Sequence, residues 1–129
     1  MKKLISILTI MILFCAGTVN AQQKKWSDLS NEEKQMKLKA FIEDNHKYMK
    51  DSLKLSADQI SDVDNVNVCY LSTLDRINRY GKTDANKEKF ASASTEARSA
   101  QLDAIMGVDK RKKFMAYVEA KLKKAKAAM

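Results

Sequence analysis

The sequence predicts an all-α protein whose four helices form two antiparallel hairpins. The chain of 129 residues has no proline and only three glycines, and few of its segments alternate between polar and apolar residues. Proline and glycine are the residues that most disfavour helix interiors, whereas alternation is the pattern of strands. The connections between the expected helices are short, which makes neighbours in the sequence antiparallel.

The first 21 residues have the pattern of a secretory signal peptide. Lys2 and Lys3 precede an apolar run at 4–16, and Val19-Asn20-Ala21 offers a small-residue cleavage site. We therefore expect an exported, periplasmic protein with a single helical domain at 22–129, of which 22–29 is a mobile lead-in. The apolar run is too short to span a bilayer.

The first helix is expected to begin after Ser30 and to run to about Leu53. Ser30 and Glu33 have the spacing of a capping box, in which each side chain satisfies a backbone N–H of the other residue. Apolar residues and one asparagine then recur at helical spacing and predict the packing face: Leu38, Ile42, Asn45, Met49 and Leu53.

The second helix has the clearest start signal in the chain. Ser56 and Gln59 form another capping box, and Leu55 can pack against Ile60 as a hydrophobic staple. Gly81 is expected to end this helix in a left-handed conformation. The predicted packing face consists of Ile60, Val63, Val66, Tyr70, Leu74 and Ile77.

Two further helices are separated by Gly107. The third begins at Thr83 or Asp84, ends at Met106, and has a predicted packing face of small residues: Phe90, Ala93, Ala97, Ala100 and Ala104. The fourth follows at once, and its predicted apolar side consists of Phe114, Met115, Val118 and Leu122.

The mature chain is basic. The leader holds two of the 24 basic residues and none of the 16 acidic ones, so 22 basic and 16 acidic side chains remain, a net charge of +6. Such charge either is simply solvated or attracts a membrane surface, an anionic polymer or acidic protein segments. Much of it lies in the last helix, at Lys110, Arg111, Lys112, Lys113, Lys121, Lys123, Lys124 and Lys126.

The sequence does not predict an enzyme, a metal site or a cofactor site. His46 is the only histidine, and Cys69 is the only cysteine of the mature chain, so a metal ligand set is lacking. Cys69 is either a small half-buried thiol or the partner in an intermolecular disulfide. Asp58, Asp62 and Asp64 cluster at the start of the second helix. Paired acids can serve hydrolysis, but these lie where a helix dipole favours negative charge. Phosphate-binding loops and the aromatic–basic pattern of nucleic-acid binding are missing.

The pentapeptide Leu55-Ser56-Ala57-Asp58-Gln59 resembles the LTxxQ motif of the Spy/CpxP-type periplasmic helical proteins, with serine in place of threonine. The family carries this motif twice. At the second position this chain has Met106-Gly107-Val108-Asp109-Lys110, a degenerate copy. The helix order and the signal peptide also agree with the family.

The resemblance implies a thin, cradle-like homodimer that holds unfolding proteins without ATP, or that damps an envelope stress sensor as a regulatory binding module. The candidate residues for apolar client contact are Trp26, Met36, Phe41 and Met49. The candidates for steering acidic segments are Lys37, Lys39, Lys50 and Arg79. Several apolar residues off the predicted packing faces would need a second surface to cover them: Met36, Val68, Leu71, Leu102 and Met106.

Overall fold

The computed structural model describes residues 26–127, and this part of the chain is helical apart from its connections. A 3-10 turn, η2 (Trp26–Asp28), precedes four α-helices: α2 (Asn31–Asp51), α3 (Ala57–Tyr80), α4 (Asp84–Met106) and α5 (Val108–Ala127). The described residues contain no strand. The prediction of an all-α chain with four helices is confirmed, whereas the predicted leader and residues 22–25 of the lead-in lie outside the described range.

The helix starts follow the capping signals of the sequence. The Ser30 hydroxyl accepts a hydrogen bond from the Glu33 backbone N–H at 3.1 Å, and the Ser30 N–H donates to the Glu33 carboxylate at 2.8 Å. Ser56 and Gln59 repeat this arrangement at 3.2 and 3.0 Å. The Thr83 side chain caps α4 by accepting a backbone N–H at 3.2 Å. Each cap satisfies backbone donors that have no partner within the helix.

The two glycines that end helices do so for different reasons. Gly107 has a φ of +81°, a conformation that side chains disfavour. Gly81 has a φ of −65°, so the predicted left-handed turn is wrong there. A Cβ at Gly81 would instead lie 2.6 Å from the Ile77 carbonyl oxygen and would also collide with the Lys87 side chain. Close approach of the chain therefore requires glycine at this position.

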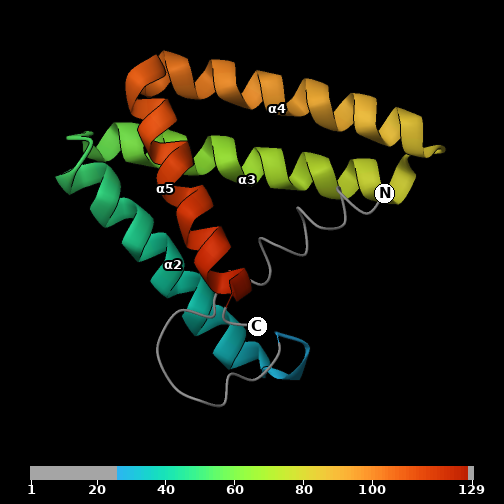
Figure 1. Cartoon of the computed structure of the whole chain (residues 1–129), viewed down its shortest axis with the longest axis horizontal. Helices are drawn as coiled ribbons and strands as arrows, with labels where there is room; N and C mark the ends of the chain where they lie inside the picture. The colour runs from blue at the N-terminus through green and yellow to red at the C-terminus, as the bar shows by residue number, and fades with distance from the viewer. Residues whose placement is uncertain (1–25, 128–129) are drawn as a thin grey trace.

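Figure 1 shows that α3 and α4 lie side by side over most of their length, whereas α2 and α5 run away from them. The two diverging helices leave from the end where α2 joins α3 and where α4 joins α5, and α5 crosses in front of α3 in this view. α2 and α3 therefore diverge from their connection, and we refer to the region between them as the opening between α2 and α3. Formation of two antiparallel hairpins and of a dimer stays a prediction.

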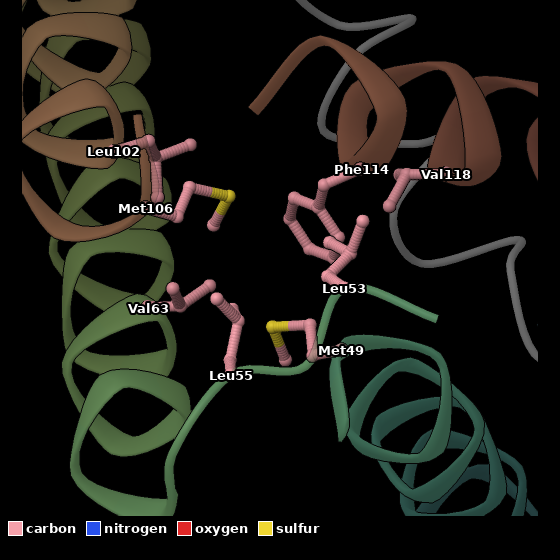
Figure 2. Packing of buried hydrophobic residues seen from close by; sticks show 8 residues of the cluster. All are labelled: Met49, Leu53, Leu55, Val63, Leu102, Met106, Phe114 and Val118. Atoms are coloured by element: carbon pink, nitrogen blue, oxygen red, sulfur yellow. The ribbon is translucent and has the colours of Figure 1, made fainter. Parts of the chain in front are cut away.

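The core lies at the end where the helices meet. Figure 2 shows its side chains pointing toward one another from α2, α3, α4, α5 and the connection between α2 and α3. Because α2 ends at Asp51, two residues before the predicted end, Leu53 belongs to that connection. The buried cluster consists of Met49, Leu53, Leu55, Val63, Leu102, Met106, Phe114 and Val118. A smaller cluster around Tyr70 and Leu74 lies farther along α3.

α4 buries a different face from the one predicted. Phe90 is 50 % exposed, and the four alanines of the predicted packing face are exposed as well. The buried residues are Arg98, Leu102 and Met106, nearly half a turn away around the helix. Leucine and methionine bury more apolar area than alanine, which favours this rotation. Leu102 and Met106 are therefore core residues, and the expectation that they need a second surface is wrong.

Candidate functional site

A groove of about 660 Å³ lies between α2 and α3 next to their connection. His46 and Asp64 lie across this groove, with Nε2 of the imidazole 2.6 Å from Oδ2 of the carboxylate. Both side chains are about half-buried, so this pair ties α2 to α3 at the boundary with solvent. The lining residues are His46, Lys47, Lys50, Asp51, Ala57, Ile60, Ser61 and Asp64.

Apolar side chains follow one turn beyond this pair on each helix. Ile42 precedes His46 by four residues on α2, and Val68 follows Asp64 by four residues on α3. Residues four apart lie on the same face of a helix, so both belong to the faces that carry the ion pair. Ile42 is 40 % exposed and Val68 is 62 % exposed. Leu38, a further turn out on α2, is also exposed.

The exposed apolar residues of α2 continue a row that is buried at the other end of the helix. Met49 is only 1 % exposed and is part of the core, whereas Ile42 and Leu38 of the same predicted packing face are exposed. Toward its N-terminus, α2 diverges from α3 (Figure 1). The side chains of Ile42 and Leu38 are therefore partly exposed to solvent within the described part of the chain. The predicted packing face of α2 is thus half core and half surface.

The four apolar residues predicted to contact clients have different environments. Met36 is 64 % exposed on the outer half of α2. Phe41 is partly buried, with the Lys121 ammonium group 4.8 Å from its ring centroid. The prediction for Met49 is corrected, because this side chain is enclosed by the core and has no surface to offer. The Trp26 side chain lies outside the described residues.

The predicted steering residues are dispersed over the surface. Lys39 lies 3.9 Å from Glu43 in a side-chain ion pair of α2, and Arg79 pairs with Asp75 of α3 at 2.5 Å. Lys50 lines the groove. These charges are not gathered in one patch: Arg79 is near the far end of α3, and the lysines, including Lys37, are on α2.

The other side of α2 is fixed to α5 by stacked and charged side chains. The rings of Tyr48 and Tyr117 stack with their centroids 3.9 Å apart and an interplanar angle of 2°. Lys121 donates to the Asp44 carboxylate at 3.1 Å and lies over the Tyr117 ring. These contacts hold the inner half of α2 against α5.

The motif residue Gln59 connects three parts of the fold. Its Oε1 accepts from the Ser56 N–H, and its Nε2 donates to the carbonyl oxygen of Ile105 at 2.9 Å. This carbonyl is in the last turn of α4, where backbone acceptors lack partners within the helix. Leu55 is buried in the core beneath the cap, and Ile60 packs against the same cluster.

The remaining reactive side chains do not form a metal or nucleophile constellation within residues 26–127. His46 has Asp64 as its partner, and Cys69 is exposed on α3. The described residues contain no group of three or more His, Cys, Asp or Glu side chains that could hold a metal ion. None of the helices in this range has the length and apolarity needed to cross a bilayer.

A buried polar layer between α3 and α4 has no counterpart among the sequence predictions. Arg98 is 8 % exposed, donates from Nε to Asn67 Oδ1 at 2.9 Å, and has its guanidinium carbon 4.7 Å from the Tyr70 ring centroid. Burial lowers the pKa of the Arg98 guanidinium, although the nearby Tyr70 acts in the opposite direction. Its spacing of four residues from Leu102 is the signal that could have placed it on the buried face.

The chain matches no protein-family model, no curated protein and no solved structure.

Proposed function

We propose that this protein is an exported, ATP-independent chaperone that holds partly unfolded clients in the opening between α2 and α3. The observation that carries the proposal is the exposed apolar pair, Ile42 and Val68, one turn beyond the His46–Asp64 pair. Apolar side chains exposed on two diverging helices offer contacts to an unfolded chain that buries its own apolar groups there. No nucleotide is needed for such contacts.

The outer half of α2 adds surface of the same kind. Leu38 extends the apolar row, Met36 is exposed on a different face of α2, and Lys37 and Lys39 adjoin these two residues in the sequence. Long-range attraction by lysines accelerates the encounter with acidic segments, whereas the apolar contacts determine how long a client stays. Weak, repeated contacts of this type suit a protein that must release its clients without an energy source.

The proposal includes membership of the Spy/CpxP-type proteins, export to the periplasm, and assembly of two chains into a cradle built from antiparallel hairpins. The motif at Leu55–Gln59 and the leader-like first 21 residues support it. Light scattering of the protein tests the dimer directly. A mass of one chain at concentrations that suppress aggregation would remove the cradle from the proposal and leave the opening of a single chain as the holding site.

Suppression of the aggregation of a denatured model protein, without nucleotide, tests the proposed activity. We expect the double variant Ile42→Ser/Val68→Ser to require about tenfold more protein for the same suppression, because two exposed apolar contacts are lost. The matched control is Phe90→Ser, which removes a larger exposed apolar side chain from α4. Circular dichroism establishes that all variants keep their helices.

Two results would contradict the proposal. The first is no suppression by the unmodified protein at several-fold molar excess. The second is an equal loss in the Phe90→Ser control, because the effect would then reflect apolar surface in general. Binding of one saturable partner that is abolished by high salt would instead favour the alternative, a regulatory module for the outer part of a membrane stress sensor.

A further inference from the structure

The positive charge of the described chain is concentrated on one helix. Eight of the 20 residues of α5 are lysine or arginine and two are acidic, a net charge of +6. Residues 26–107 hold 12 basic and 14 acidic side chains, a net charge of −2. Since Lys24 and Lys25 precede this range, α5 carries the whole net charge of the chain from Gln22. An anionic surface would therefore orient the molecule with α5 toward that surface.

Only some of the α5 cations are engaged within the fold. Arg111 pairs with Asp103 at 2.5 Å and Lys121 pairs with Asp44 at 3.1 Å. Four other lysines of α5 are exposed and form no ion pair with any described residue: Lys112, Lys113, Lys123 and Lys124. These four side chains are free to bind an external anion.

The four free lysines form two pairs on one face of the helix. Lys112 and Lys123 are separated by 11 residues, as are Lys113 and Lys124, which corresponds to about three turns and about 16 Å. Between the pairs lie the exposed small residues Ala116 and Ala120. Asp109 and Glu119 are the two carboxylates of this helix, and they leave the field of α5 strongly positive.

The apolar side of α5 is unavailable to a ligand, because Phe114 and Val118 are buried in the core (Figure 2). α5 therefore cannot lie in a bilayer as an amphipathic helix that inserts its apolar face. The exposed basic face contains no aromatic side chain on which nucleic-acid bases could stack. Two pairs of exposed, flexible lysines on either side of small alanine side chains are suited to a flat anionic surface.

We propose that the exposed face of α5 docks the protein on an anionic lipid bilayer by electrostatic contact with the headgroups, without insertion of α5. This interaction is separate from client holding, since Ile42 and Val68 belong to the opening between α2 and α3. Bound through α5, the protein holds its clients beside the membrane.

Co-sedimentation with vesicles tests the proposal, using the chain from Gln22, which keeps every described residue. We expect binding to vesicles that contain phosphatidylglycerol, no binding to phosphatidylcholine alone, and release at high salt. Replacement of the four free lysines by glutamine should weaken binding at least about 100-fold, since each lysine near an anionic surface contributes about fivefold.

A second variant with the same net charge serves as the control. It replaces four exposed lysines outside α5 by glutamine: Lys47, Lys50, Lys82 and Lys89. Equal weakening in the two variants would overturn the proposal, because net charge and not the α5 face would then explain the binding. Binding to phosphatidylcholine vesicles, failure to sediment at low salt, or retention by heparin without vesicle binding would overturn it as well. Aggregation assays without lipid distinguish its failure from failure of the chaperone proposal.

Discussion

Gln59 shows why a glutamine, and not the more common capping-box glutamate, suits this position. Its amide accepts at Ser56 and donates to the Ile105 carbonyl, and a carboxylate could only accept. We expect Gln59→Glu to lower the free energy of unfolding by about 1 kcal/mol at neutral pH, the usual net contribution of one hydrogen bond. Urea-induced unfolding measures this difference.

The pH dependence of the same variant provides an internal control. A protonated glutamic acid can donate to the Ile105 carbonyl, and the neighbouring carbonyl oxygen disfavours the ionised form. The protonated form thus restores the donor that the ionised carboxylate lacks. The deficit of Gln59→Glu relative to the unmodified protein should shrink below about pH 4.3. A deficit that does not change with pH would contradict the assigned role of the Nε2 donor.

Lys54 has a backbone conformation that favours glycine. Its φ of 55° lies in the left-handed region, between the buried Leu53 and Leu55. A residue with a Cβ pays about 1–2 kcal/mol for this conformation, and glycine avoids that cost. Glycine in turn costs about 0.5–1 kcal/mol, because it has more conformational freedom in the unfolded chain. We expect Lys54→Gly to raise the free energy of unfolding by about 0.5–1 kcal/mol in thermal unfolding. Lys54→Ala keeps the Cβ and should bring no gain, so equal stability of the two variants would show that the conformation is unstrained.

The helices differ in how much of their packing the sequence predicts. For α3, every residue of the predicted packing face is buried or partly buried, because most of its large apolar residues recur on that face. For α4, two faces compete at helical spacing. The alanine face is uniform but small, whereas the face with Leu102 and Met106 is interrupted by Arg98. Arg98 becomes tolerable there only because Asn67 and Tyr70 of α3 contact it, and a single helix pattern does not contain that information.

The candidate site was predictable only in part for a related reason. Capping boxes and periodicity are local, and they indicate where α2 begins and which of its faces is apolar. These local patterns do not predict the angle between α2 and α3. That angle determines that Met49 is buried and that Ile42 is exposed. The His46–Asp64 pair likewise depends on this angle, because its members are 18 residues apart on different helices. Which half of the α2 packing face is exposed is therefore determined by tertiary packing and not by the sequence pattern of α2.

Phe114 occupies the one place in the described structure where all four helices contribute to a single buried cluster. Removing its ring leaves a cavity between them, and Phe114→Ala should lower the free energy of unfolding by about 3–5 kcal/mol. This is a large fraction of the total stability of a small domain, about 5–15 kcal/mol. The matched control is Phe90→Ala on α4, where the ring is 50 % exposed and the loss of stability should stay within about 0.5 kcal/mol.

Because the Tyr70–Leu74 cluster between α3 and α4 does not involve Phe114, hydrogen exchange of Phe114→Ala should show α2 and α5 losing protection more than α3 and α4. Uniform loss of protection in all four helices would mean that the two clusters unfold as one unit, and the opening between α2 and α3 could then not widen independently of the α3–α4 pair.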